Sequence, residues 1–453
     1  MTEHAAHTEA SFDTRAAHAG AEWSDAASRT VPLYLTAGFR FDAFDTAAEH
    51  FATGAGFGYT RTGNPTVSAL EQKLATLESG AEAVFLASGQ AAVTTALLTL
   101  LSAGDHIVLS AHIYEGTRGL VFDNLSRLGI TATLVDEISD PDAWRRATRR
   151  ETRAYFAESI ANARNDILDV ALVAGVADEF GIPLVVDNTF ATPALLRPIE
   201  HGAAIVVHSA SKFLGGHGAA LGGVIVDDGR FDGVTAGRLF PHLVERNASG
   251  APSPWERHGG RARIAYARET VAPRFGATPS PFNAFLVGQG AETLGLRVRH
   301  QSAGALALAT WLEEQPEVAS VDYAGLPTHP DHDLAVRQLQ GGFGSVFAFT
   351  LNGGEPAARA FVEAVQLVTH MTHLGDVRTL VLHPASTSHS GHAESERVRR
   401  GVLPGTLRLS IGIEDVDDLR RDLARALAAA GAASGSPAAV AGSGDRSTEE
   451  ILA

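Results

Sequence analysis

The segment "ILDVALVAGVADEFGIPLVVDNT" (167–189) decides the fold class, because it joins a helix to a strand. Its first part has the apolar spacing of a helix and ends at Gly181, followed by Ile-Pro, a combination that stops helices. The remainder, "PLVVDNT" (183–189), is apolar at its centre and predicts a strand that is buried on both faces. A helix that leads directly into such a strand is typical of a parallel sheet.

The same alternation of apolar runs and helical segments extends over the middle of the chain. One helical segment is "AAVTTALLTLLSAG" (91–104), which lies between two apolar runs. Buried strands that alternate with helices imply a mostly parallel sheet with helices on both faces. We therefore predict an α/β fold built on a mostly parallel, seven-stranded sheet. Its strands are expected at 83–88, 106–110, 132–136, 154–159, 183–189, 204–210 and 222–227.

Composition separates three further parts from this sheet. The residues before the helix "VSALEQKLATLESG" (67–80) lack a core pattern. At the other end of the sheet region, a Pro- and Gly-rich break after residue 272 introduces a long helix (284–315) and strand-like runs. The C-terminal end is rich in Ala, Gly and Ser. We expect an extended N-terminal arm (1–70), the sheet domain (71–272), a smaller α+β C-terminal domain (273–430) and a disordered tail (431–453).

The length and composition are typical of a globular protein with more than one domain. The chain has 453 residues and a formal net charge of −16, which argues against nucleic acid or an anionic membrane as a partner. It has no cysteine, which excludes disulfides, thiolate nucleophiles and Cys-ligated zinc. No signal peptide is evident, and no apolar run is long enough to span a bilayer. A cytoplasmic location is the resulting expectation.

Polar residues gather where the predicted strands end. In a parallel sheet these carboxyl ends lie along one edge, and ligands bind beyond it. After strand 83–88, "SGQ" (88–90) opens a helix whose backbone N–H groups can hold an anion. The other strands contribute the remaining members of this edge, which are Tyr114, Glu158, Asn162, Asp187, Ser209, Ser211 and Lys212.

Lys212 is the most informative of these residues, because lysine is rare in this sequence. Lys73 and Lys212 are the only lysines among 36 lysines and arginines. Arginine stays protonated, whereas lysine can lose its proton and attack a carbonyl carbon. A phosphate requires the anion site and hydroxyls, a protonated pyridine nitrogen requires a carboxylate, and an aldehyde requires the lysine. Pyridoxal 5'-phosphate (PLP) needs all three, so we predict PLP as the cofactor.

Each of these residues taken alone has a simpler explanation. Asp187 could be a turn residue or a helix cap, and Ser88-Gly89 could be a tight turn without a ligand. Lys212 could be a point charge that binds phosphate, or the amine of a Schiff-base aldolase. Lys73 lies among glutamates on a predicted helix, so we expect it on a solvated helix face. The convergence of the other residues at one edge favours the cofactor site.

Several long motifs resemble those of one enzyme family. They are "GYTRTGNPT" (58–66), "ASGQAA" (87–92), "VVDNTFATPALLRPIEHGA" (185–203), "IVVHSASKFLGGHG" (205–218), "LVLHPASTSHS" (380–390) and "LRLSIGIEDVDDL" (407–419). With these motifs the chain resembles the Cys/Met-metabolism family of fold-type-I PLP enzymes, and within it the O-acetylhomoserine sulfhydrylases. The resemblance implies a fold-type-I PLP transferase in which residues 71–272 form the PLP-binding domain.

The resemblance also implies roles for individual residues. Lys212 would hold the cofactor covalently and carry protons during catalysis, and Asp187 would pair with the pyridine nitrogen. Tyr114 would stack on the ring and act in catalysis. Tyr59, also expected to be catalytic, and Arg61 would reach the phosphate from a neighbouring subunit. The remaining expected ligands are Ser88, Gly89, Gln90, Asn162, Ser209 and Ser211 for the cofactor, and Arg408, Thr379 and Asn162 for the substrate.

The reaction implied by the resemblance is a γ-replacement on O-acetylhomoserine. Sulfide or another thiol would displace acetate, and homocysteine would form. Cystathionine γ-synthase and the cystathionine or methionine γ-lyases are the alternatives within the family, and a Schiff-base aldolase is the alternative outside it. The resemblance implies a cytoplasmic enzyme of methionine biosynthesis, with a homodimer as the smallest active unit and a homotetramer expected.

Two stretches depart from the family pattern. Ala163 stands where proline is usual, although Asn162 before it is retained. The stretch "THMTH" (369–373) replaces one of small residues or Asn, a difference that concerns the substrate pocket. His370 and His373 have no carboxylate or cysteine beside them, so no metal site is expected.

Overall fold

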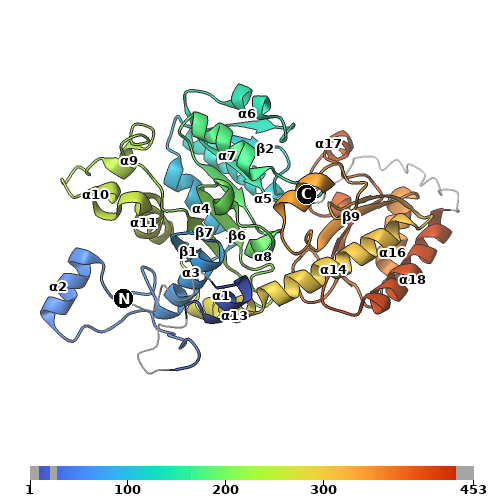
Figure 1. Cartoon of the computed structure of the whole chain (residues 1–453), viewed down its shortest axis with the longest axis horizontal. Helices are drawn as coiled ribbons and strands as arrows, with labels where there is room; N and C mark the ends of the chain where they lie inside the picture. The colour runs from blue at the N-terminus through green and yellow to red at the C-terminus, as the bar shows by residue number, and fades with distance from the viewer. Residues whose placement is uncertain (1–9, 21–27, 163, 435–453) are drawn as a thin grey trace, which may run out of the picture.

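The larger of two sheets forms the centre of the protein (Figure 1). A computed structural model describes residues 10–20, 28–162 and 164–434. The seven strands of this sheet are β1 (Glu82–Leu86), β2 (His106–Ser110), β3 (Thr131–Val135), β4 (Thr152–Glu158), β5 (Leu184–Asp187), β6 (Ile205–Ser209) and β7 (Gly223–Asp227). Their order is β1-β7-β6-β5-β4-β2-β3, and only β7 runs antiparallel to its neighbours. The predicted α/β fold with a mostly parallel seven-stranded sheet is confirmed.

Both faces of this sheet are buried, as the apolar strands predict. Val185 and Val186 are neighbours on β5, yet they belong to two separate hydrophobic cores. The core around Val185 includes apolar side chains of α4 (Gly89–Leu100). The core around Val186 includes those of α3 (Pro65–Leu77), α7 (Val170–Glu179) and α13 (Pro281–Glu292). Alternate side chains of each strand therefore pack against helices on opposite sides.

The decisive segment folds as its sequence predicts. Asp169 caps α7 by accepting a hydrogen bond from the backbone N–H of Leu172, and Gly181 adopts a φ of +69° just after the helix ends. The strand β5 then lies between β4 and β6. Its register places Asp187, the last residue of β5, beside Glu158, the last residue of β4. This pairing brings the two carboxylates to the same edge of the sheet.

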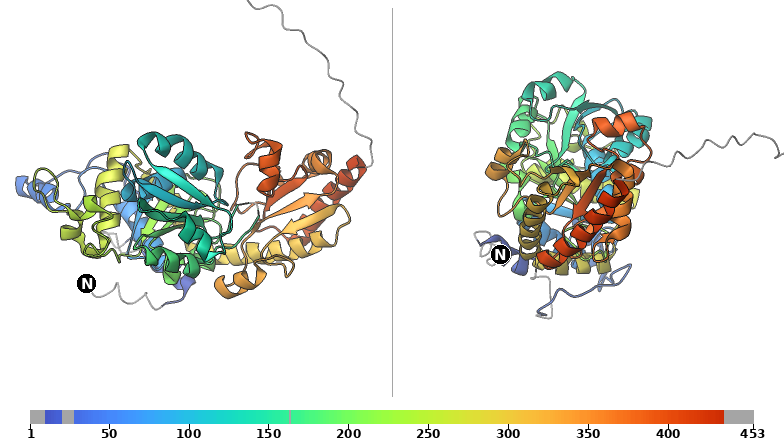
Figure 2. Two further views of the ribbon diagram at one scale, coloured as in Figure 1. Left: turned by 90° about the horizontal axis from the view of Figure 1, so that it is seen from above. Right: turned by 90° about the vertical axis from the view of Figure 1, so that its right-hand side faces the viewer.

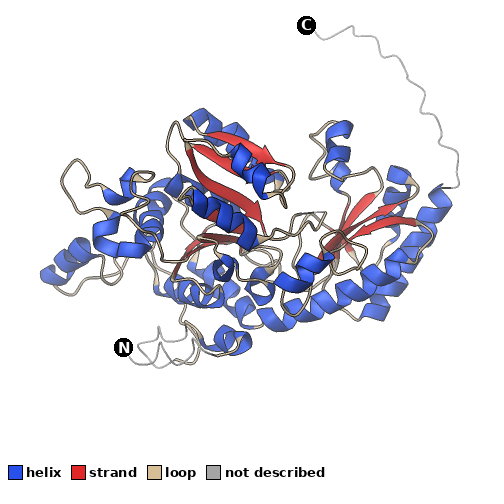
Figure 3. Ribbon diagram, turned by 45° about the horizontal axis from the view of Figure 1, so that its top comes forward, coloured by secondary structure: helices blue, strands red, loops and turns tan. Residues whose placement is uncertain are grey.

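The second sheet has five strands in the order β10-β11-β12-β9-β8. They are β8 (Val318–Asp322), β9 (Val346–Leu351), β10 (Thr369–His370), β11 (Leu380–Leu382) and β12 (Thr406–Ser410). Three helices share one hydrophobic core with this sheet, namely α14 (Leu294–Glu313), α16 (Gly354–Ala364) and α18 (Val416–Ser434). Figure 3 shows the two sheets as separate groups of strands, and α14 runs along the five-stranded one (Figure 1). The N-terminal part of α14 reaches a core of the larger sheet through Leu294 and Val298. Shorter helices connect the elements of both parts: α5 (Glu115–Gly119), α6 (Pro141–Ala147), α8 (Thr192–Leu195), α9 (Pro241–Val244), α10 (Pro254–His258), α11 (Ala262–Tyr266), α12 (Ala272–Phe275), α15 (His332–Gln338) and α17 (Glu394–Arg399).

Two predictions about helices need correction. The single long helix expected over 284–315 is two helices, because Thr293 between α13 and α14 has a φ of −108° and a ψ of 12°. The helix α18 continues to Ser434, four residues into the segment expected to be disordered from residue 431. Residues 435–453 of that tail lie outside the described residues. No helix in the described part of the chain is long and apolar enough to cross a membrane.

The region before residue 70 contains helices where an extended arm was predicted. The first, α1 (Phe12–His18), contacts α3, α13 and α14. The second, α2 (Phe44–Thr53), has no buried residue and lies at the end of the molecule farthest from the five-stranded sheet (Figures 1 and 2). The arm is therefore partly helical rather than extended.

The packing of α1 overturns the prediction for Lys73. That side chain is 5% exposed, and its Nζ donates a hydrogen bond to the backbone oxygen of Ala16. Glu292 on α13 lies 3.9 Å from the same nitrogen. The expected solvated face of α3 is covered by α1 and α13, so Lys73 is a buried structural residue.

A buried ion pair joins the end of β7 to α11, and we expect its loss to destabilise the protein strongly. Arg263 donates to the Asp227 carboxylate at 2.9 Å, and Asp227 is fully buried. Arg263→Ala leaves that carboxylate unpaired, so we expect the free energy of unfolding to fall by about 3–5 kcal/mol in urea titration at fixed protein concentration. The exposed pair Arg246–Glu256 provides the control, since Arg246→Ala should cost about 0–1 kcal/mol. Equal losses in the two variants would contradict this account.

Candidate active site

A cavity of about 440 Å³ lies at the carboxyl ends of the central strands. Asp187, Glu158 and Ser209 are the last residues of β5, β4 and β6, and all three line it. The five-stranded part contributes the opposite wall through residues such as His373 and Arg408. The structure thus brings together most of the predicted site: Ser88, Gly89, Gln90, Tyr114, Asn162, Asp187, Ser209, Ser211, Lys212 and Arg408.

One end of the cavity is an anion site at the start of α4. Ser88 caps this helix, and its hydroxyl oxygen accepts a hydrogen bond from the backbone N–H of Ala91 at 3.1 Å. The first N–H groups of a helix have no intrahelical partner and attract anions. A Cβ on Gly89 would lie 2.7 Å from the Cβ of Ser209, so glycine is required for α4 to approach β6. The arrangement fits a phosphate group.

Two adjacent carboxylates occupy the middle of the cavity. Asp187 accepts hydrogen bonds at Oδ1 from the backbone N–H and the hydroxyl of Thr189, at 3.0 and 2.5 Å. Burial raises the pKa of Asp187, and burial together with the charge of Asp187 raises the pKa of Glu158 to about 8. Glu158 accepts the backbone N–H groups of Tyr114 and Asn162. A cationic ring nitrogen beside Asp187 would stabilise the ionised form of that carboxylate. Glu158 has a different role, because its two hydrogen bonds position Asn162 after β4 and Tyr114 after β2.

The other end of the cavity carries two cationic side chains. Burial and then the Arg408 charge lower the pKa of Lys212 to about 8. Arg408 is itself buried, and this burial lowers its pKa to about 10. Its guanidinium donates to the Oδ1 of Asn162 at 3.1 Å and to the backbone oxygen of His373 at 3.2 Å. No ion pair of Arg408 occurs among the described residues, so it can bind an anionic ligand.

The chemistry of this cavity fits PLP. A helix N-terminus for phosphate, a buried carboxylate for the ring nitrogen and a lysine with a lowered pKa all line one space. Residues 13–428 match the family described as Cys/Met metabolism PLP-dependent enzyme. The chain belongs to this family. The predicted cofactor class is thereby confirmed.

Individual members of the Cys/Met-metabolism family resemble the chain over almost its whole length. It is 41% identical to O-acetyl-L-homoserine sulfhydrylase of Corynebacterium glutamicum, over 91% of this chain and 95% of that protein. It is 42% identical to O-acetyl-L-homoserine sulfhydrylase 1 of Thermus thermophilus, over 92% of this chain and 99% of that protein. It is 39% identical to O-succinylhomoserine sulfhydrylase of Pseudomonas aeruginosa, over 92% of this chain and 95% of that protein.

A solved structure from the same family matches the fold closely. The structure of an O-acetylhomoserine (thiol)-lyase from Campylobacter jejuni superposes with a TM-score of 0.88 at 33% identity. The match covers 92% of this chain and 99% of the Campylobacter chain. That structure contains N'-pyridoxyl-lysine-5'-monophosphate, a lysine joined to the cofactor.

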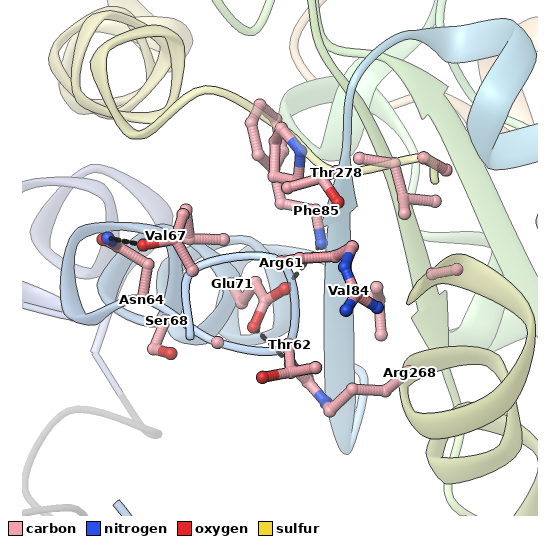
Figure 4. Close-up of a pocket in the computed structure, with 16 residues that line it drawn as sticks. Arg61, Thr62, Asn64, Val67, Ser68, Glu71, Val84, Phe85, Arg268 and Thr278 are labelled. Atoms are coloured by element: carbon pink, nitrogen blue, oxygen red, sulfur yellow. Dashed lines mark hydrogen bonds and ion pairs between the residues drawn. The ribbon is translucent and has the colours of Figure 1, made fainter. Parts of the chain in front are cut away.

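Two predicted residues of this family member do not line the cavity of their own chain. The Tyr59 side chain is half exposed, and the Arg61 guanidinium lies 5.6 Å from the centre of its ring. Arg61 also donates to the backbone oxygen of Pro273 at 3.2 Å. Arg61, Glu71 and Arg268 line a separate pocket of about 40 Å³. Figure 4 shows these three side chains. Within a single chain, Tyr59 and Arg61 therefore have no access to Lys212.

The prediction that Thr379 binds substrate needs correction. Thr379 is fully buried and does not line the cavity. Its hydroxyl donates to Glu414 at 2.8 Å and accepts the backbone N–H of Gly412 at 2.9 Å. Through these bonds the Thr379 hydroxyl joins the start of β11 to the loop after β12. The role of Thr379 in this chain is therefore structural.

Ser211 lines the cavity but has internal partners as well. Its hydroxyl accepts the backbone N–H of Gly222 at 3.0 Å and donates to the oxygen of the same residue at 3.3 Å. These two bonds tie the turn that contains Lys212 to Gly222, the residue just before β7. Positioning of this turn is thus a second role beside the predicted contact with phosphate.

Sequence reasoning missed the contact between His373 and the site. Its Nδ1 lies 3.1 Å from the Nζ of Lys212. The departure of "THMTH" (369–373) from the family pattern was a signal that this stretch concerns the substrate pocket. Among the described residues, no group of three or more His, Cys, Asp or Glu side chains is placed to hold a metal ion.

Proposed function

We propose that the protein catalyses γ-replacement on O-acetylhomoserine, in which sulfide displaces acetate and homocysteine is formed. The observation that carries this proposal is that Lys212 and Arg408 line the same cavity. Arg408 is buried and has no ion-pair partner among the described residues. An amino acid supplies the missing carboxylate, and the lysine supplies the base. Relatives named as O-acetyl-L-homoserine sulfhydrylases, 41–42% identical over most of the chain, support the choice of substrate.

The residues of the cavity would hold the cofactor in one orientation. The N-terminus of α4 at Ser88, Gly89 and Gln90, with Ser209, would bind the phosphate, and Asp187 would pair with the ring nitrogen. Lys212 would bind the aldehyde carbon. When bound, PLP serves as an electron sink that makes protons on the substrate carbons easier to remove.

The substrate would be oriented by Arg408 and Asn162. Two guanidinium nitrogens can bind a carboxylate in parallel, which fixes the direction of the amino-acid backbone. Asn162 already accepts a hydrogen bond from Arg408 and holds it in place. The Lys212 amine, whose pKa is lowered to about 8, would remove a proton from one carbon and deliver it to another. Acetate leaves with the electron pair of its C–O bond, and sulfide forms the new C–S bond.

We also propose that the active unit is a homo-oligomer, with a dimer as the minimum and a tetramer expected. Tyr59 and Arg61 lie away from the cavity of their own chain and would complete the phosphate site of a neighbouring subunit. The exposed side chains of Phe44 and Phe51 on α2 support contact with another copy. A biosynthetic role of this kind favours a cytoplasmic location.

The lining of the cavity favours acetyl over succinyl as the leaving group. Lys212 and Arg408 are its only Lys or Arg side chains among the described residues, and both already have roles. The succinyl group carries a second carboxylate, for which the lining offers no further Lys or Arg, and the acid Glu115 of that lining already pairs with Arg400.

The test is to incubate purified holoenzyme with O-acetyl- or O-succinylhomoserine, in the presence of sulfide, of cysteine or of neither, and to identify products by mass. We expect homocysteine only with sulfide, and kcat/KM at least about tenfold higher for the acetyl ester. Release of 2-oxobutyrate without sulfide would show a γ-lyase instead. A preference for cysteine as the thiol would show a cystathionine γ-synthase, and either result would overturn the proposal.

A further inference from the structure

The side chains of Lys212 and His373 meet in the cavity although 161 positions separate them in the chain. The Nζ of Lys212 lies 3.1 Å from the Nδ1 of His373. Lys212 follows β6 of the seven-stranded sheet, whereas His373 lies between β10 and β11 of the five-stranded sheet. The contact therefore joins the two sheets at the amine that carries the proposed chemistry.

The protonation states of the two groups set the direction of this hydrogen bond. Burial and then the Arg408 charge lower the pKa of Lys212 to about 8. Burial and then the Lys212 charge lower the pKa of His373 to about 4, with Asp376 opposing the shift. At neutral pH the imidazole is therefore uncharged, while most of Lys212 is protonated. An ammonium group only donates, so Nδ1 is the acceptor and the ring proton belongs on Nε2.

One further contact and one buried atom without a partner place the imidazole on the substrate side of the cavity. The backbone oxygen of His373 accepts a hydrogen bond from Arg408, the expected carboxylate ligand. The Nε2 of His373 is buried and has no hydrogen-bond partner among the described residues. The ring can therefore donate to a ligand through Nε2 while it accepts from Lys212 through Nδ1.

We propose that His373 is a positioning residue for the Lys212 amine: its Nδ1 accepts a hydrogen bond from the protonated Nζ and keeps that proton directed into the cavity between its removal and its delivery. This inference rests on the proposed function, in which Lys212 carries protons. A neutral acceptor suits the role, because it stabilises the ammonium form without the charge of a carboxylate. A carboxylate at this place would hold Lys212 permanently protonated.

Other charged groups near Lys212 and His373 also affect the pKa values of these two residues, so a test has to leave them unchanged. Arg408 lowers the pKa of both Lys212 and His373. Arg378 also lowers that of His373, whereas Asp376 raises it. The remaining ionisable side chains that line the cavity are Tyr114, Glu115, Glu158 and Asp187. Substitutions at position 373 leave all of these groups in the chain, so a change in the pKa of Lys212 reports on the imidazole.

The presence of only two lysines makes a direct measurement feasible. The cofactor-free full chain is labelled with trace acetic anhydride over a series of pH values, and peptide mass spectrometry gives the apparent pKa of Lys212, with Lys73 as an internal control. His373→Leu removes the acceptor and is expected to lower the pKa of Lys212 by about one unit. His373→Asn places an amide oxygen where Nδ1 stands, so it should keep most of the original value.

Two results would overturn the inference. The first is an unchanged pKa of Lys212 in His373→Leu, provided that its thermal unfolding matches that of the unsubstituted chain. The second is an equal shift in the Leu and Asn variants, since the acceptor would then be irrelevant. His373→Gln, whose amide lies farther from the backbone than Nδ1, replaces the leucine variant if that one does not fold, and the same shift is expected.

A second readout uses the holoenzyme. The limb of the kcat–pH profile that reports Lys212 should move to lower pH in His373→Leu and stay in place in His373→Asn. An equal movement of this limb in the two variants would count against the proposal. The labelling result does not depend on the reaction catalysed. A shift in the pKa of Lys212 in a chain that makes no homocysteine would refute the proposed function and leave the contact with His373 established.

Discussion

Substitution of Lys212 by arginine is expected to reduce turnover by about four orders of magnitude or more. Arginine keeps the positive charge and much of the length of lysine, so the electrostatic environment next to Arg408 changes little. It stays protonated, however, and can neither bind the aldehyde of the cofactor nor accept a proton from the substrate. The lowered pKa of Lys212, about 8, is the property that the substitution removes.

The measurement combines product formation with the visible absorbance of the cofactor. In Lys212→Arg the cofactor should absorb as the free aldehyde or be lost on dialysis. Lys73→Arg is the matched control, since Lys73 is the other lysine of the chain and lies buried against Ala16, away from the cavity. We expect this control to retain the absorbance and the activity. Retention of both properties by Lys212→Arg would contradict the assignment of the site.

The sheet and its edge could be predicted because local patterns determine them. The β-branched run before Asp187 and the stop at Gly181 are both visible in the sequence, and a run that is apolar throughout predicts a strand buried on two faces. A parallel sheet then brings the residues after each strand to one edge without further information. The sequence alone therefore predicts that Lys212, Asp187 and the start of α4 lie at one edge of the sheet.

The contacts that could not be predicted depend on distant parts of the chain. Lys73 looks solvated on its own helix and is buried only because α1 packs over it. Thr379 resembles a substrate ligand by position, yet its hydroxyl faces Glu414. His373 reaches Lys212 from the other sheet. Each outcome is set by how separate elements pack, and a local pattern carries no signal for that.

Substitution of Arg408 by lysine is expected to reduce kcat/KM for O-acetylhomoserine by about two orders of magnitude, chiefly through KM. Arg408 is 6% exposed and has no ion-pair partner among the described residues, so a substrate carboxylate would be its first anionic partner. A lysine keeps the charge but lacks the planar fork that binds two carboxylate oxygens and also donates to Asn162 and to the backbone of His373.

Arg378→Lys is the matched control for this prediction, because Arg378 lies near the same wall but is exposed and pairs with Asp376. We expect its kcat/KM to stay within about twofold of the unsubstituted enzyme, since the exposed Arg378 side chain does not line the cavity and lysine keeps the charge opposite Asp376. The cofactor absorbance should be unchanged in both variants, as neither residue is a proposed ligand of PLP. A loss of absorbance in Arg408→Lys would place Arg408 at the cofactor rather than at the substrate carboxylate, and an unchanged KM would remove it from substrate binding altogether.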